Sequence, residues 1–235
     1  MKRKKYEDIS CNNCQLTHLS VFKHLTQDEL DVLNFEKGCN HYKRGNIIFH
    51  EGNKGNGVYC IYKGVVKLYK TGIDGREQII RFAKDGDIIG FRSVLSNESA
   101  CSTAKAINDV SLCFIPAKTF YTLVQDNRNF SLNLIQLSCK ELGEANKFIL
   151  DLAQKNVRER LAEVLLLLDE TFGRDKDNVL QINLTREEIA NIVGTATEST
   201  IRLLSEFKKD KLIELNGRNI KILKMKELQR ISDVY

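Results

Sequence analysis

The chain changes character at its single proline, Pro116. Before that residue, glycines separate short runs of apolar and β-branched residues, which is typical of strands joined by tight turns. Between Pro116 and Gly173 the chain contains one glycine, Gly143, and its apolar residues recur at three- and four-residue spacing, as on one face of a helix. We therefore expect an α+β protein in which a β-rich part precedes a helical part.

Short strands are expected throughout the β-rich part. Their ranges are Ile47–His50, Val58–Tyr62, Val65–Tyr69, Gln78–Phe82, Ile88–Ile89, Thr103–Ile107 and Ser111–Ile115. Many short strands at this spacing favour a β-sandwich or barrel.

Two helices are expected after Pro116. The apolar face of the first includes Phe130, Leu134, Leu137, Leu142, Ile149 and Leu152. This long helix has few partners nearby in sequence, so its face predicts either a dimer seam or packing on its own domain. The second helix, Val157–Phe172, ends at Gly173.

The most informative stretch begins at Leu184. Thr185 and Glu188 form a capping box, which predicts a helix start. Gly194 is placed to end that helix in the left-handed conformation. A further helix is expected from Thr197 to about Lys209, and two short helices joined by a glycine turn form a helix-turn-helix pattern.

The second of these helices divides into two faces at 100° per residue. Glu198, Ile201, Arg202 and Ser205 share one sector, whereas Thr200, Leu203, Leu204 and Phe207 lie opposite. Arg can donate two hydrogen bonds to guanine and Glu can accept one from cytosine, so the first face suits base reading. The hydroxyls of Thr185, Thr197, Ser199 and Thr200 are candidates for phosphate contacts. The alternative is an ordinary surface ion pair between Glu198 and Arg202.

A β-hairpin is expected directly after this helix. Leu212–Leu215 and Ile220–Leu223 flank Asn216-Gly217, a strong hairpin signal. The hairpin reads as the wing of a winged helix-turn-helix. Lys208, Lys209, Lys211 and Arg218 would then lie near the DNA backbone and add salt-dependent affinity.

Charge and composition are compatible with this interpretation. The formal net charge is +5, and the segment from Arg202 to Tyr235 holds nine basic and five acidic residues. The longest aliphatic run, Val164–Leu168, is far too short for a membrane span, and no signal peptide is apparent, so we expect a cytoplasmic protein without membrane contact. No Ser/His/Asp grouping, phosphate loop or zinc-enzyme spacing of the histidines indicates an enzyme.

In the order of its parts, nearly the whole chain resembles the Crp/Fnr family of transcription factors. The resemblance rests on Gly45-Asn-Ile-Ile-Phe-His-Glu-Gly, Gly86-Asp-Ile-Ile-Gly-Phe, Asn156-Val-Arg-Glu-Arg-Leu-Ala and the helix-turn-helix stretch. It implies a cyclic-nucleotide-binding-type jelly roll at 1–126, a long dimerisation helix at 127–154 and a winged helix-turn-helix at 155–235. It also implies a homodimer that binds palindromic double-stranded DNA at promoters, contacts RNA polymerase and responds to a redox, oxygen or small-molecule signal.

Two departures from the family pattern concern specificity. Ile201 stands where many members carry Ser or Gly, and it could touch a thymine methyl instead. In the cassette that binds cyclic nucleotides in one branch, Phe91 replaces a Glu and Cys101 replaces an Arg. Without the Arg, the phosphate loses its charge-assisted partner, which disfavours cyclic AMP in the usual mode.

The cysteines resemble those of the oxygen-sensing branch, which binds an iron–sulfur cluster. Cys11 and Cys14 match its N-terminal pair, Cys113 matches its distant ligand, and Ser20 replaces the expected third N-terminal cysteine. His18, Cys39 or a carboxylate are candidate substitutes. Three interpretations stay open: a bound cluster, a redox-active dithiol, and a remnant without a cluster.

The sequence also gives expectations for the remaining cysteines and for two alternative functions. Cys60 and Cys139 are expected to be small core residues. Besides a DNA-binding regulator, we considered an effector-binding scaffold and a thiol-based redox protein, neither of which would bind DNA. The predicted wing and polar helix face favour the regulator.

Overall fold

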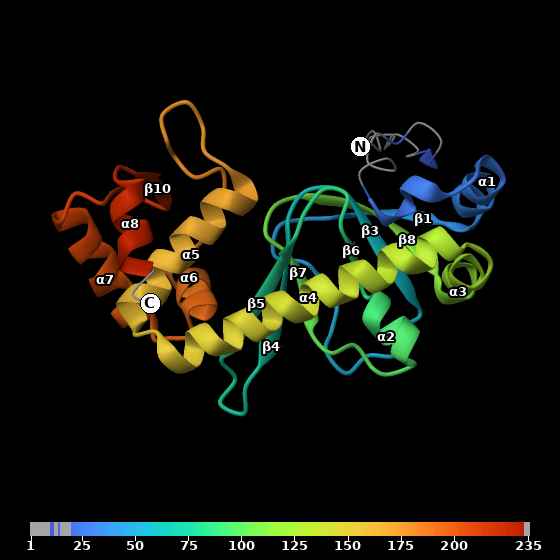
Figure 1. Ribbon diagram of the computed structural model, residues 1–235, viewed down its shortest axis with the longest axis horizontal. Coiled ribbons are helices and arrows are strands. Elements are labelled where there is room, and N and C mark those ends of the chain that lie inside the picture. The colour runs from blue at the N-terminus through green and yellow to red at the C-terminus, as the bar shows by residue number, and fades with distance from the viewer. Residues whose placement is uncertain (1–9, 12–13, 15–19, 233–235) are drawn as a thin grey trace, which may run out of the picture. The chain divides into compact units, whose positions relative to one another are not determined.

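The computed structural model describes residues 10–11, 14 and 20–232. The chain forms two compact units, one comprising the residues up to Lys70 together with Ile80–Leu142, and the other Thr71–Ile79 with Gly143–Tyr235. The first, the β-rich unit, contains most of the strands, and the second, the helical unit, contains four of the shorter helices and a hairpin (Figure 1). No helix in the described part of the chain is both long and apolar enough to cross a membrane.

Two four-stranded sheets build the β-rich unit. The first has the strand order β1 (Gly38–Tyr42), β8 (Val110–Pro116), β3 (Gly57–Lys63) and β6 (Ile88–Ile89). The second has the order β2 (Ile47–Phe49), β7 (Thr103–Ala106), β4 (Val66–Thr71) and β5 (Glu77–Ala83). This is the expected jelly-roll architecture. Every expected strand is present, and β1 is an additional one.

The first sheet buries both of its faces. Ile61 and Leu112 point into a core shared with residues of the second sheet, such as Leu68 and Ala104. Val58 and Ile115 point to the other side, where they pack with side chains from the helices, among them Phe22, Phe120 and Phe130. The helices on that side are η3 (Val21–His24), α1 (Gln27–Glu36), α2 (Phe91–Ser96), α3 (Ala117–Asp126) and the first turns of α4 (Arg128–Gln154).

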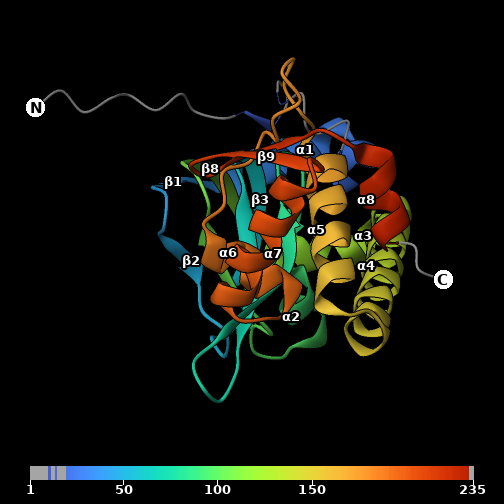
Figure 2. The same cartoon turned by 90° about the vertical axis from the view of Figure 1, so that its left-hand side faces the viewer.

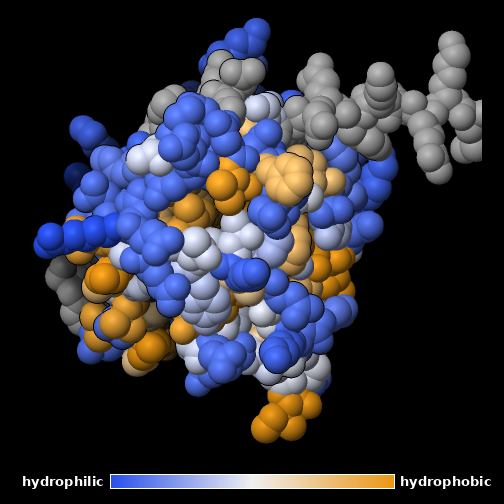
Figure 3. All heavy atoms as spheres, turned by 90° about the vertical axis from the view of Figure 1, so that its right-hand side faces the viewer, coloured by the Kyte–Doolittle hydropathy of each residue, from blue (hydrophilic) through white to orange (hydrophobic). Residues whose placement is uncertain are grey.

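The long helix α4 leaves a line of apolar side chains uncovered. Phe130 and Leu134 are buried, but Ile135, Leu142 and Ile149 are 58%, 62% and 62% exposed. These three residues recur every seven positions, with Leu132 and Cys139 three residues before the first two, which is the a/d pattern of a coiled coil. Cys139 is exposed, so its assignment to the core was wrong. Figure 3 shows apolar residues gathered on the flank where α4 lies.

The helical unit consists of α5 (Val157–Phe172), α6 (Arg186–Val193), α7 (Thr197–Lys209), α8 (Met225–Ser232) and the hairpin β9 (Ile213–Asn216) and β10 (Asn219–Ile222). Figure 2 views this unit with α6 and α7 in front. Its core contains Leu161 and Leu165 from α5, Ile189 from α6 and Phe207 from α7, each at most 1% exposed. α5 occupies the expected range and packs against α6, α7 and α8.

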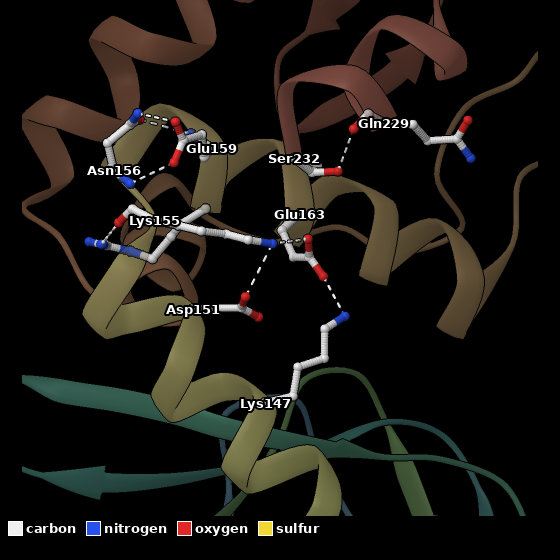
Figure 4. A network of polar contacts seen from close by, with 9 residues as sticks. Lys147, Asp151, Lys155, Asn156, Glu159, Glu163, Gln229 and Ser232 are labelled. Carbon is white, nitrogen blue, oxygen red and sulfur yellow. Dashed lines mark hydrogen bonds and ion pairs between the residues drawn. The ribbon is translucent and has the colours of Figure 1, made fainter. Parts of the chain in front are cut away.

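A chain of ion pairs holds the end of α4 to α5 (Figure 4). The ammonium group of Lys155 lies 3.1 Å from Asp151 and 2.8 Å from Glu163, and Lys147 lies 2.7 Å from the second oxygen of Glu163. Burial raises the pKa of Glu163, but the hydrogen bonds from the two lysines outweigh burial and lower it overall. The charged form of Glu163 is therefore favoured by folding.

We expect Glu163→Gln to lower the free energy of unfolding by about 1–2 kcal/mol at neutral pH, because two lysines lose their charged partner. A carboxylate with a lowered pKa stabilises the fold above its unfolded pKa, about 4.3, and this stabilisation disappears as the pH falls through the folded value. The difference from wild type should therefore shrink below about pH 4. Denaturant titrations at several pH values measure it. Glu170→Gln, at an exposed position of α5, is the control; an equal loss in both variants would contradict the role of Glu163.

Candidate nucleic-acid interface and cysteine pocket

The turn between α6 and α7 has the expected local chemistry. Thr185 Oγ1 accepts a hydrogen bond from the Glu188 backbone N–H at 3.0 Å, and Glu188 Oε2 accepts one from the Thr185 N–H at 2.8 Å. Gly194 adopts φ 71° and ψ 50°, the left-handed conformation that ends a helix. α7 starts at Thr197, as expected. The helix-turn-helix is thus formed by a capping box and a glycine stop.

α7 separates a buried face from an exposed one. Leu203, Leu204 and Phe207 pack into the helical unit. Glu198, Ile201, Arg202 and Ser205 are exposed, which is the division that the sequence predicts. No ion pair joins Glu198 to Arg202 within the described chain, although they stand one helical turn apart. The exposed face therefore offers an acceptor and a donor that form no ion pair with any described residue.

The hydroxyl groups expected to reach phosphates lie in different surroundings. Thr197 and Ser199 are partly exposed near the start of α7, and Thr185 uses its oxygen for the capping box. Thr200 is only 1% exposed and its Oγ1 has no hydrogen-bond partner in the described part of the chain. The structure thus places Thr200 away from the surface shared by the other candidates.

The hairpin follows α7 and is tied to α6. Asn216 pairs with Asn219, so the two turn residues are Gly217 and Arg218, with Gly217 at φ 58°. The turn therefore lies one residue later than Asn216-Gly217, because the strand extends to Asn216. Arg186 Nη2 donates to the carbonyl of Gly217 at 2.8 Å. Sequence reasoning missed Arg186, which anchors the wing, whereas Lys208 and Arg218 are exposed as expected.

Two arginines from the start of α5 brace the helix-turn-helix. Arg158 lies 3.3 Å from Glu206 and 2.9 Å from Asp210, and its guanidinium group stacks over the Phe207 ring at 4.8 Å. Arg160 Nε donates to the last carbonyl of α6, at Val193, over 2.9 Å. The motif beginning at Asn156 therefore has a structural purpose, since it fixes α6 and α7 against α5.

Four thiols line one pocket of the β-rich unit. Cys11 and Cys14 come from the N-terminal segment, Cys60 from β3 and Cys113 from β8. The Cys11 backbone N–H donates to Asn34 of α1 at 3.0 Å, which attaches that segment to the unit. The structure therefore brings together the three expected ligands and adds Cys60.

The strand register explains why Cys60 belongs to this pocket. Cys60 on β3 pairs directly with Cys113 on β8, and Cys113 pairs with Cys39 on β1. Directly paired residues on neighbouring strands point to the same face of a sheet. The three thiols thus form a row on the face that carries the helices. Cys60 was expected to be a core residue, and it does pack against the buried cluster on this side of the sheet, but it also lines the pocket.

The environment of these thiols favours their neutral forms. Burial is the main cause that raises the pKa of Cys60 to about 12, with smaller contributions from Cys14 and Cys11. Burial also raises the pKa of Cys11, although the ammonium group of Lys37, which hydrogen-bonds to it, acts in the opposite direction. Thiols in this state are poor nucleophiles, and a metal that binds them must displace protons.

The donors present fit a thiolate-ligated centre. Four cysteines reach one pocket, which is the number that iron–sulfur clusters use. Ser20 lines the same pocket but is 8% exposed, and its oxygen caps η3 by accepting from the Phe22 N–H at 3.3 Å. Of the substitutes considered for the missing cysteine, Cys39 contacts Cys113 with 3.5 Å between their sulfur atoms, and His18 lies outside the described residues.

A second pocket lies where the family's nucleotide cassette would be. It is lined by residues near β2, by Gly90 and Ser93 at the start of α2 (Phe91–Ser96), and by Ala100. Phe91, at the position of the Glu, is 1% exposed and belongs to the core. Lys54 and His50 are the basic residues that line this pocket. The chemistry of the lining gives a phosphate no arginine fork, and the expectation against cyclic AMP stays a prediction.

Models of two protein families match the two units. The cyclic nucleotide-binding domain matches residues 39–127, and the Crp-like helix-turn-helix domain matches residues 159–231. Together they cover the jelly roll and the helix-turn-helix described above.

Two relatives match this chain over most of its length. The fumarate and nitrate reduction regulatory protein of Yersinia pestis is 30% identical over 217 residues, which cover 91% of this chain and 86% of that protein. The anaerobic regulatory protein of Aggregatibacter actinomycetemcomitans is 28% identical over 227 residues, 95% and 88% of the two chains.

Among solved structures, FixK2 from Bradyrhizobium japonicum superimposes with a TM-score of 0.76 at 24% identity, covering 85% of this chain and 98% of that one. A CRP/FNR-family regulator from Thermus thermophilus superimposes with a TM-score of 0.72 at 23% identity, covering 83% of this chain and 98% of that one. The structural likeness shows the fold, and the sequence relatives show the family. The chain is a member of the Crp/Fnr family of DNA-binding transcription regulators and is not an enzyme.

Proposed function

We propose that this regulator acts as a homodimer that reads palindromic promoter DNA through the exposed face of α7 and changes its DNA binding with the oxygen or redox state of the cell. In this proposal Glu198 and Arg202 read base edges, Ile201 touches a neighbouring thymine methyl, and Lys208 and Arg218 contact the phosphate backbone. Thr185, Thr197 and Ser199 are proposed to add phosphate contacts.

The observation that carries the DNA-reading proposal is the free donor and acceptor on α7. Glu198 and Arg202 are exposed, and in the described chain neither forms an ion pair with the other. By contrast, Arg158, Arg160 and Arg186 of the same unit all bind protein groups. An exposed arginine that forms no ion pair with the described residues is available for guanine.

The proposed dimer is supported by the uncovered heptad of α4. Exposed Ile135, Leu142 and Ile149 give the helix an apolar seam, and a second copy of the same helix is the partner that such a repeat fits. A two-fold dimer would place two α7 helices about one helical turn of DNA apart, which explains a palindromic site. The segments 1–126, 127–154 and 155–235 are then the sensor, the dimerisation helix and the DNA-binding domain.

The signal is proposed from the cysteine pocket and the relatives. Relatives of this chain are named for anaerobic regulation and for fumarate and nitrate reduction. Four thiols that line one pocket are a ligand set through which a thiolate-bound centre would respond to oxygen or to redox state. Such a regulator would work in the cytoplasm and would contact RNA polymerase at its promoters, as the family resemblance implies.

Selection of binding sites from random duplex DNA tests the central part of the proposal. We expect an inverted repeat with a G·C pair at one fixed position in each half-site and a preference at the adjoining position that reflects Ile201. Selected sequences without a repeat, or without a G·C preference, would contradict base reading by Glu198 and Arg202.

Two substitutions separate base reading from backbone binding. Arg202→Ala should weaken binding to the selected site by about 1–3 kcal/mol and relax the preference at one base pair. Lys208→Ala should weaken binding to selected and random DNA alike and should reduce the salt dependence. Fluorescence anisotropy titrations at several salt concentrations measure both effects. Equal losses on both kinds of DNA for Arg202→Ala would remove its role as a base reader.

Cys139 provides a direct test of the dimer. It occupies an a position of the α4 heptad, so in a parallel pair of helices the two Cys139 thiols would face each other. Mild oxidation should therefore produce a covalent dimer with twice the 26.9 kDa mass of the chain on a non-reducing gel. Cys139→Ser should abolish that band, and Cys101→Ser, which removes another exposed thiol, should retain it. A covalent dimer that depends on Cys101 instead would place the seam elsewhere.

A further inference from the structure

We propose that Cys60 is a ligand of an iron–sulfur cluster and completes a set with Cys11, Cys14 and Cys113. The inference deepens the proposed redox response, on which it rests, by naming the residue that replaces the expected cysteine at position 20. It concerns a residue that its sequence surroundings, Val58-Tyr-Cys-Ile-Tyr, mark only as part of a buried strand.

The position of Cys60 follows from the pairing of β3 with β8. Cys113 is the direct partner of Cys60, so both thiols leave the sheet on the same face. The segment containing Cys11 and Cys14 lies over that face, and all four residues line one pocket. Lys37 lines it as well and hydrogen-bonds to Cys11, and a positive charge there stabilises thiolates.

Ser20 is a poorer ligand than Cys60 for two reasons. Clusters are held by thiolates, and a hydroxyl group does not ionise as a thiol does. The Ser20 oxygen also caps η3 through the Phe22 N–H, so ligation would remove the cap from that turn. Cys60 offers a thiol to the same pocket with no such structural duty.

Cys39 is the other candidate, but its position is less suitable. It lies on β1 at the edge of the sheet, beyond Cys113, whereas Cys60 lies on β3 in the interior. Its sulfur atom contacts that of Cys113 at 3.5 Å, and Cys39 is not among the residues that line the pocket. A metal centre bound by Cys11 and Cys14 would therefore lie in the pocket that Cys60 also lines.

The spacing of the thiols favours a cluster over a single ion. Across the described ranges no three His, Cys, Asp or Glu side chains converge on one point closely enough to hold one metal ion. In a cluster the four thiolates are shared among two or four iron atoms, so no single ion has to be reached by all of them. The cavity is narrow, about 30 Å³, so loading requires the segment containing Cys11 and Cys14 to move away from the sheet.

Anaerobic reconstitution of the full-length protein with iron and sulfide tests the proposal. The wild type should take up about two or four iron atoms with equal sulfide per chain and show broad visible absorption. Cys60→Ala should lose at least about nine-tenths of both, as expected when one of four ligands is removed. Cys39→Ala is the matched control, because it removes the neighbouring thiol of the same row, and it should load like the wild type.

A rescue variant separates ligation from folding. Ser20→Cys combined with Cys60→Ala restores four thiols to the pocket and should recover the iron, the sulfide and the absorption. Failure of this rescue, with the protein folded by circular dichroism, would overturn the assignment. Full loading of Cys60→Ala together with loss in Cys39→Ala would overturn it in favour of Cys39.

DNA binding distinguishes this inference from the proposed function. A wild-type protein that binds selected DNA but takes up no iron and sulfide, or takes up zinc without sulfide, would overturn the cluster and leave DNA reading intact. A protein that loads the cluster but shows no preference for selected DNA would contradict the proposed function and leave the ligand set standing.

Discussion

The antiparallel pairing of β3 with β8 is the constraint on which the β-rich unit depends. Because side chains alternate along each strand, this one register sends Ile61 and Leu112 into the core between the sheets and Val58 and Ile115 toward the helices. The same alternation places Cys60 and Cys113 on the helical side. A slip of β3 by one residue would turn Cys60 toward the core and away from Cys113, so packing and the cysteine pocket depend on the same pattern of hydrogen bonds.

In the helical unit, some arginine side chains bind protein groups and others are exposed on the surface. Arg158, Arg160 and Arg186 are bound to carboxylates or carbonyl groups and hold α5, α6, α7 and the hairpin together. Arg202 and Arg218 are exposed on the surface of the same unit. Bound arginines give rigidity to the frame, and exposed ones can donate to DNA. Base readers on a rigid helix lose little conformational entropy on binding, which favours specificity.

The sequence predicts elements best where the signal is local. The capping box at Thr185, the stop at Gly194 and the range of α5 depend on neighbours in the chain, and they occur as expected. Helix α1 was not predicted, although Thr26 and Glu29 form the same capping box, because the expected helices rested on the periodicity of apolar residues. Strand β1 was missed because it is an edge strand of mostly polar residues, Gly-Cys-Asn-His-Tyr.

Site residues whose partners lie far away in the sequence could not be predicted from it. Cys60 precedes Cys113 by many residues, and only the register of two strands brings them together. Arg186 was missed because its partner, the Gly217 carbonyl, is a backbone atom that no residue pattern marks. Cys139 was assigned to the core because its neighbours are apolar, but heptad position and not composition decides which helix face is exposed.

In the proposed mechanism, a chemical state of the β-rich unit controls DNA binding by the helical unit. The most direct measurement is the affinity of one protein preparation for its selected palindrome, first without oxygen and then after exposure to air. At constant salt concentration we expect the two affinities to differ by at least about fivefold, which is the smallest change in affinity that coupling between two sites typically produces. Equal affinities in the two states, with the cysteines shown to have changed, would contradict it.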